Sequence, residues 1–512
     1  MYFNITCYVA IMITNNYSLA CCTFFFFKLL FMFNFCIVVG CVVIFSLNRY
    51  VHNITAIKEK SFIAVTKNIL ISNLIINILL MGILFYYILF LHKQCVLELL
   101  TTGIKYMYIA PRLQILWWSF DLDIYNIIFY MLSIFVAFIS LLSLDTRLYG
   151  TKLIFLVLCN LLVFVIFLFS FTNNYVLFFL FYEFLLIPSF FFVYRISPAK
   201  TAIQSSIYFV MWTQIGSFLV FLAIIFCIVL TNTYEFINLA TFKFTEQELL
   251  ILQYLLFFGF GIKIPVWPFH YWITKTHVDA PTGFSIFLSG FLVKTALFGF
   301  YKFSIVLGFF HNNIIFSTIC LLGVVDASMK MWGQTDLKKL VAYATIQEMG
   351  LVYLTLCFGD TTAIIGGFIF CVTHAFLSSI FFFLVDTISR RFYTRNITEI
   401  NGILHLTPTL GIMVLLSCIF YSGLPGTLKF ISEIYLFAGL VDVTPLSAIF
   451  VLFIANFFGL IGFSKVWFNV VFGMTLIPNK FMVMDLSSKE LYTLIICYVG
   501  LFSWGFIIPN FI

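Results

Sequence analysis

The chain has 512 residues, of which 63% are hydrophobic and only 9% are charged. Soluble domains carry about 25% charged residues, so this composition excludes a soluble enzyme and predicts a polytopic membrane protein. The net charge of +7 is spread over loop ends. There it fits orientation in the bilayer and contact with lipid headgroups, and it does not indicate nucleic-acid binding.

Apolar runs of membrane-spanning length follow one another along the chain, separated by polar or turn-rich breaks. A bilayer helix needs about 20 apolar residues, so the pattern predicts an all-α membrane fold of about 14 helices. The irregular residues 93–122 are a candidate re-entrant or interfacial segment. The runs fall at 29–47, 70–92, 124–143, 152–171, 174–195, 203–230, 248–267, 283–308, 313–331, 337–356, 362–385, 408–441, 445–473 and 490–509.

Two of these predicted helices are interrupted. The first has Pro265 and Pro268 at its end, and the second contains Pro425 and Gly426. Paired broken helices are typical of transporters built from inverted repeats, so we expect two inverted five-helix repeats. The predicted division is 1–150 for accessory helices, 151–310 and 311–475 for the two repeats, and 476–512 for a C-terminal helix.

Two lysines lie inside these apolar runs, Lys263 directly before the first break and Lys294 one helix later. A charge at the centre of a bilayer helix costs roughly 2.5–3.5 kcal/mol on insertion scales, which makes each a candidate ion-carrying site. A buried ammonium exchanges its proton more readily than a guanidinium does. The alternative is snorkelling to an interface, which the central positions argue against.

Four further titratable residues lie inside apolar segments: Glu183, and in three later consecutive segments Glu348, His374 and Glu433. Carboxyls inside spans are rare and mark ion or proton pathways, and histidine titrates nearest neutral pH. Together with the two lysines they predict a polar axis of proton-exchanging groups. The alternative for Glu183 is a structural carboxyl bonded to a neighbouring helix. For Lys429, beside the second break, we expect a cap on the half-helix.

Other polar residues give weaker signals. His270, His277 and Asp279 follow the first break and either line an access path or sit at the membrane interface. The 13 cysteines include no CxxC, and we read them as packing residues. Cys371 lies near His374 on one helix face, but two ligands do not make a metal site. No nucleotide, flavin, haem or cluster motif is present, so we expect this chain to bind no cofactor or metal.

At these residues the chain resembles the antiporter-like membrane subunits of respiratory complex I, and in particular the subunit 4 branch of the mitochondrial enzyme. The resemblance covers about 150–470, and residues 1–120 match only in hydropathy. The matching motifs are Tyr182-Glu-Phe-Leu-Leu-Ile-Pro188, Lys263-Ile-Pro-Val-Trp-Pro-Phe-His-Tyr-Trp272, His277-Val-Asp-Ala-Pro281, Gly290-Phe-Leu-Val-Lys294, Asp336-Leu-Lys-Lys-Leu-Val-Ala-Tyr343 and Leu424-Pro-Gly-Thr-Leu-Lys-Phe-Ile-Ser-Glu433.

The resemblance implies a 14-helix fold with inverted repeats and a multi-pass place in the mitochondrial inner membrane. The partners it implies are other membrane-arm subunits, above all the sister antiporter-like subunits 2 and 5, and membrane lipids. It also implies proton translocation driven by electron transfer from NADH to ubiquinone. The complex uses NADH, FMN, iron–sulfur clusters and ubiquinone in other subunits.

The family's functional positions correspond to Glu183, Lys263, Lys294, His374 and Glu433. At the position of Glu348 the family usually has histidine, so the relay there must differ in its resting charge. Asp279 stands where glutamate is usual. Two alternatives remain. One is a subunit of a stand-alone cation/proton antiporter. The other is a structural scaffold that has lost transport, which the retained buried charges argue against.

Overall fold

The computed structural model describes most of the chain from residue 112 onward. The described residues are 34, 68, 71–79, 82, 112–115, 118–121, 123–143, 149–308, 314–358, 361–443, 448–450, 453–473 and 484–507. They divide into two compact units, Met1–Phe138 with Arg147–Leu185, and Ile139–Thr146 with Leu186–Ile512. Most of the predicted runs 29–47 and 70–92 lies outside the described residues, so their helices stay predictions.

The first unit contains the described part of the candidate segment 93–122, which forms a short hairpin. Strands β1 (Arg112–Ile115) and β2 (Trp118–Asp121) pair antiparallel. The helices of this unit include α5 (Tyr149–Phe171) and α6 (Tyr175–Phe184) and most of α4 (Ile124–Leu142). Tyr130 packs edge-on against Phe167, with ring centroids 5.3 Å apart. Aromatic side chains therefore hold α4 against α5.

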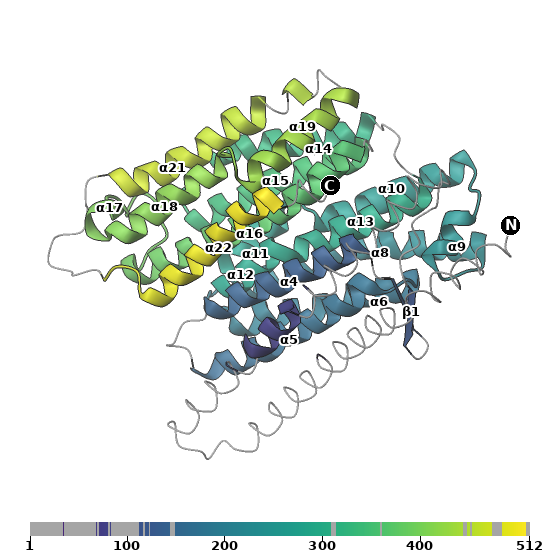
Figure 1. Ribbon diagram of the computed structural model, residues 1–512, viewed down its shortest axis with the longest axis horizontal. Helices are drawn as coiled ribbons and strands as arrows, with labels where there is room; N and C mark the ends of the chain where they lie inside the picture. The colour runs from purple at the N-terminus through teal and green to yellow at the C-terminus, as the bar shows by residue number, and fades with distance from the viewer. Residues whose placement is uncertain are drawn as a thin grey trace, which may run out of the picture. The chain divides into compact units, whose positions relative to one another are not determined.

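The regular elements described in the second unit are all helices, joined by turns and loops (Figure 1). Every predicted run from 124–143 onward contains described helix, which confirms the helical membrane fold. Nine helices of the described residues are long and apolar enough to cross a membrane. The elements are α7 (Leu186–Phe191), η1 (Phe192–Ile196), α8 (Ala202–Thr231), α9 (Phe236–Thr241), α10 (Glu246–Lys263), α11 (Tyr271–Asp279), α12 (Thr282–Phe287), η2 (Leu288–Leu292), α13 (Val293–Leu307), α14 (Ile314–Met331), α15 (Leu337–Phe358), α16 (Thr361–Phe392), α17 (Ile403–Leu406), α18 (Pro408–Tyr421), α19 (Leu428–Val443), η3 (Phe453–Gly459), α21 (Leu460–Phe472) and α22 (Ser488–Ile507), with η1 to η3 π-helical.

Both helix interruptions lie inside this unit. Helix α10 ends at Lys263, and α11 begins at Tyr271. The indole of Trp272 donates to the Ile262 carbonyl at 3.0 Å, so one carbonyl freed by the break is satisfied by protein, as membrane depth requires. At the second break, Gly423 and Gly426 adopt positive φ angles of 76° and 91°, a backbone that glycine adopts without strain.

Helices α16 and α19 cross unusually closely. A Cβ atom on Gly366 would lie 2.4 Å from the Leu436 amide nitrogen, and one on Gly439 would lie 2.3 Å from that of Ala363. Both distances are shorter than real carbon contacts, so only glycine allows the backbones to approach this far. Small residues serve the same purpose at other membrane helix crossings. The crossing fixes which side chains of α16 and α19 meet.

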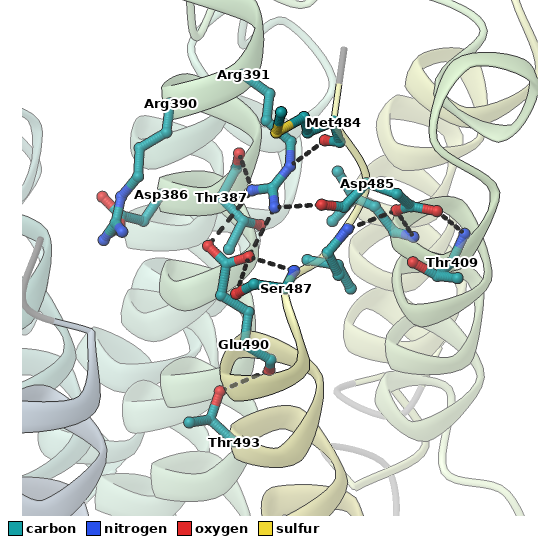
Figure 2. A network of polar contacts seen from close by, with 12 residues as sticks. Asp386, Thr387, Arg390, Arg391, Thr409, Met484, Asp485, Ser487, Glu490 and Thr493 are labelled. Atoms are coloured by element: carbon teal, nitrogen blue, oxygen red, sulfur yellow. Dashed lines mark hydrogen bonds and ion pairs between the residues drawn. The ribbon is translucent and has the colours of Figure 1, made fainter.

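A network of polar contacts joins the ends of three helices (Figure 2). Arg391 of α16 contacts the Glu490 carboxylate of α22 at 2.6 Å and donates to the Asp485 carbonyl at 3.0 Å. The Asp485 carboxylate in turn accepts the Thr409 and Leu410 amides at 2.8 and 3.1 Å. These amides belong to the first turn of α18, which Asp485 therefore caps from a distant part of the chain.

Replacement of Asp485 by alanine is expected to destabilise the fold by about 1 kcal/mol, because the first turn of α18 loses its anionic cap. Partial burial raises the pKa of Asp485, but hydrogen bonds from Thr409, Leu410 and Leu486 outweigh this effect and hold the pKa below its ordinary value. A carboxyl group whose pKa is lower in the folded than in the unfolded protein stabilises the fold at pH values above its unfolded-state pKa. This stabilisation is lost as the pH falls through the folded-state pKa. Thermal unfolding of the purified assembly should show a deficit at pH 7 that shrinks at acid pH. An Asp442→Ala variant, at an exposed site, should show neither effect.

Candidate functional site

The site begins at Lys294, which is 1% exposed in the first turn of α13. Its Nζ donates to the Ser289 carbonyl at 2.6 Å. Ser289 lies in the π-helical turn η2 directly before α13, and π turns are frequent at functional sites. The Ser289 hydroxyl also lies 3.5 Å from Nε2 of His374. One serine therefore contacts both the buried lysine and the buried histidine.

His374 of α16 connects this lysine to α15. Its Nδ1 lies 2.5 Å from Oε2 of Glu348, and both side chains are almost wholly buried. A neutral imidazole has one nitrogen that donates and one that accepts, so His374 is able to pass a proton between its two sides. The predicted His374 and Glu348 are thus direct neighbours.

The other carboxylate oxygen of Glu348, Oε1, lies 2.7 Å from Nζ of Lys429. The same Nζ lies 3.9 Å from Oε1 of Glu433, one turn further along α19. Our expectation that Lys429 caps the half-helix was wrong, because its ammonium lies between two carboxylates. The spacing of Lys429 and Glu433, four residues on one helix, was the sequence signal for this role.

These side chains form one continuous buried row, which we call the polar line. It runs from α13 and the adjoining turn η2 to α16, α15 and α19. Within the second unit η2 packs against α16, and α15, α16 and α19 pack against one another. Glu433 is its least buried member, with 18% of its side chain exposed. The members are Lys294, Ser289, His374, Glu348, Lys429 and Glu433.

The other two predicted residues are Lys263 and Glu183. Lys263 is 6% exposed and is the last residue of α10, where the partial negative charge of a helix C-terminus favours a cation. Glu183 is partly exposed near the end of α6. It belongs to the first unit and Lys263 to the second, so the pairing of Glu183 with Lys263 stays a prediction.

The residues that follow the first break have different surroundings. His277 is fully buried and stacks on Phe382, with ring centroids 4.8 Å apart. His270 lies 3.2 Å from the carboxylate of Asp326, which also pairs with a lysine on its own helix. Asp279 accepts the Thr201 hydroxyl at 2.8 Å and so connects this segment to the start of α8.

Sequence reasoning also missed Lys338, which it used only as part of a family motif. The side chain is 4% exposed and donates to the Ala280 carbonyl at 2.8 Å. Among the described residues no group of three or more His, Cys, Asp or Glu side chains is arranged to hold a metal. The chemistry that this interior offers is thus proton exchange among its carboxylates, lysines and histidines.

Comparison with known proteins points in the same direction. A family model described as NADH:quinone oxidoreductase/Mrp antiporter, TM, matches residues 172–459. The chain is 41% identical over 393 residues to NADH-ubiquinone oxidoreductase chain 4 of Paramecium tetraurelia, covering 76% of this chain and 82% of that protein. It is 28% identical to NADH-quinone oxidoreductase subunit M of Rhodobacter capsulatus, covering 76% and 78%.

Two solved structures share the fold. A chain of respiratory complex I from Thermus thermophilus with bound NADH gives a TM-score of 0.71 at 21% identity, covering 89% of this chain and 96% of that one. A chain of the Mrp complex from Dietzia gives a TM-score of 0.77 at 13% identity, covering 93% and 94%. The chain therefore belongs to the NADH:quinone oxidoreductase/Mrp antiporter membrane family, in its chain 4 branch.

Proposed function

We propose that this chain translocates protons as a membrane-arm subunit of NADH:ubiquinone oxidoreductase. The observation that supports this most directly is the polar line, a buried run of polar and titratable residues. Its successive contacts, which include the Ser289 backbone carbonyl, are 2.5–3.9 Å long. A structural scaffold gains nothing from buried charge, because desolvation costs several kcal/mol per ion. The row is suited to moving a proton through an apolar interior.

Proton transfer along the polar line proceeds between neighbours. When Nζ of Lys294 turns from the Ser289 carbonyl, which it contacts in the structure, to the hydroxyl of the same residue, its proton passes by way of that hydroxyl to Nε2 of His374. The Nδ1 proton of the imidazole then passes to Glu348. The hydroxyl both donates and accepts, so it relays a proton without becoming charged. The row works in either direction, and the charge on its neighbours sets which way the proton moves.

The driving event is a change of charge in a neighbouring subunit that shifts an ion pair of Glu183 with Lys263. A lysine in an apolar surrounding holds its proton mainly through its partner carboxylate. When that partner turns away, Lys263 releases its proton towards Lys294. Electron transfer takes place in other subunits, which use NADH, FMN, iron–sulfur clusters and ubiquinone, and this chain holds no redox centre.

The proposed surroundings are the mitochondrial inner membrane, its lipids, and the sister antiporter-like subunits 2 and 5. The relatives named as chain 4 of NADH-ubiquinone oxidoreductase support this setting. Mass spectrometry of the natively purified particle tests it, and NADH-oxidising subunits should copurify. The shared fold with the Mrp complex favours a second candidate, a stand-alone antiporter, and for that case only other antiporter chains should appear.

Replacement of Lys263 by methionine is expected to slow proton transfer through this chain at least about 100-fold. Methionine keeps the apolar stem but has no proton to release. NADH-driven pumping by the reconstituted complex should therefore lose the share that this chain contributes. A Lys465→Met variant, at an exposed position on α21, is the matched control and should pump normally. Unchanged pumping in the Lys263 variant would remove Lys263 from the mechanism.

A further inference from the structure

We propose that Lys429 is itself a proton-transferring residue, the one that joins Glu348 to Glu433 and without which Glu348 cannot act. This inference rests on the proposed function and adds one member to its relay. Lys429 lies between the two carboxylates, 2.7 Å from Glu348 and 3.9 Å from Glu433. Among the described residues, no other side chain of the polar line joins α15 to α19.

The position of Lys429 is costly unless the ammonium has a purpose. The residue is 4% exposed, and an ion in such a place is stable only with close partners. Nζ of Lys429 donates one hydrogen bond to Glu348 and lies 3.7 Å from the centre of the Tyr421 ring. The ring of Phe370 lies 5.8 Å away on the adjacent helix α16. Both rings stabilise a cation through their π faces.

The two aromatic rings also restrict where the ammonium can go. Tyr421 is the last residue of α18 and Phe370 lies on α16, so the two rings approach the lysine head from different helices. Glu348 and Glu433 occupy other directions. The lysine stem is flexible, and a change of its rotamer brings Nζ from one carboxylate to the other. The 3.9 Å separation of Nζ from Oε1 of Glu433 exceeds hydrogen-bond length, so this movement precedes the transfer of a proton to Glu433.

The transfer conserves protons and charge at each step. Lys429 gives a proton to the Glu433 carboxylate, which breaks an N–H bond and forms an O–H bond, leaving a neutral amine and a carboxylic acid. The amine then takes a proton from protonated Glu348, which breaks that O–H bond and restores the ammonium and a Glu348 carboxylate. The net result is one proton moved from Glu348 to Glu433, and the reverse sequence moves it back.

A purely structural ion pair makes a different prediction, and arginine separates the two. A Lys429→Arg variant keeps the positive charge and can pair with Glu348. A guanidinium releases its proton at least about 100-fold less readily than an ammonium, judged from ordinary peptide values. If Lys429 only balances charge, arginine serves as well as lysine. If Lys429 transfers protons, arginine preserves assembly and blocks the relay.

The experiment uses the complete complex carrying the variant chain, purified and reconstituted into sealed vesicles. NADH oxidation and proton uptake are measured together. For Lys429→Arg we expect a normal subunit content and proton transfer through this chain slowed about 100-fold, with Lys465→Arg on the exposed face of α21 behaving as wild type. Wild-type proton uptake in the Lys429→Arg complex would overturn the inference.

A double variant covers the case in which arginine is too large for the site. Lys429→Met combined with Glu348→Gln removes the closely paired buried charges together and leaves only the Glu433 carboxylate, which is partly exposed, so the complex should assemble and fail to pump through this chain. Wild-type pumping by the double variant also overturns the inference. The Lys263→Met variant keeps the two questions apart. If it loses pumping while either Lys429 variant keeps it, the proposed function stands and only the role of Lys429 fails.

Discussion

Replacement of Glu348 by glutamine is expected to both destabilise the protein and stop proton transfer through it. Glu348 is the one anion that contacts His374 and Lys429 together, at 2.5 and 2.7 Å. Removing it leaves the buried Lys429 ammonium without its hydrogen-bonded carboxylate, which costs about 3 kcal/mol at sites of this kind. The relay also loses the acceptor between His374 and α19. Thermal dissociation of the complex and NADH-driven proton uptake measure the two effects.

The control for Glu348→Gln is the same change at Glu246, an exposed residue in the first turn of α10, which should alter stability by a few tenths of a kcal/mol. A second comparison adds Lys429→Met to the Glu348 variant. The stability should then recover, since the buried ammonium is gone and the remaining Glu433 carboxylate is partly exposed, while the pumping should not. A Glu348→Gln complex that is as stable and as active as wild type would show that the polar line is not used.

Replacement of Lys294 by methionine is expected to stop proton transfer without destabilising the protein. Nζ of Lys294 donates to a neutral carbonyl, that of Ser289, so methionine removes a buried charge without stranding a carboxylate bonded to it. We expect assembly and melting temperature to be kept or raised, and proton transfer through the chain to fall at least about 100-fold. Proton uptake and thermal dissociation of the same preparation separate the two.

The matched control for Lys294 lies on the same helix. Lys302 is partly exposed and its Nζ lies 4.7 Å from the centre of the Phe236 ring, so Lys302→Met should cost a little stability and leave pumping unchanged. The contrast is diagnostic, because a general effect of methionine on α13 would appear in both variants. Retained pumping by the Lys294 variant would exclude Lys294 as a relay member.

Much of the fold follows from hydropathy, since the apolar runs from 124 onward correspond to helices. The short hairpin of Arg112–Ile115 and Trp118–Asp121 was not predicted, because it lies in a segment with no periodicity. Among the site residues, Lys294, Glu348, His374 and Glu433 stood out as rare charges or histidines within apolar runs. The structure brings these four into one row.

The parts that sequence reasoning missed depend on contacts between distant segments. Lys429 looked like a cap because it follows a break, and nothing in its own helix shows that α15 lies beside it. That proximity depends on the close crossing at Gly366 and Gly439, which follows from tertiary packing. Ser289 was missed for a related reason, since serines are common in membrane helices and only the π-helical turn places this one between Lys294 and His374.

The π-helical turn at Leu288–Leu292 also affects how the deletion of a residue from this helix is tolerated. An α-helix turns about 100° per residue, and a π turn accommodates an additional residue without ending the helix. Loss of a single residue within this turn would return it to an ordinary α-turn and leave the side chains before and after it close to their present directions. Loss of a residue from the regular α-helical part would instead rotate the side chains on one side of the deletion by about 100° relative to those on the other. The turn is therefore the place in this helix where a residue is lost with the least change of direction, although Ser289 itself must remain for its contact with His374.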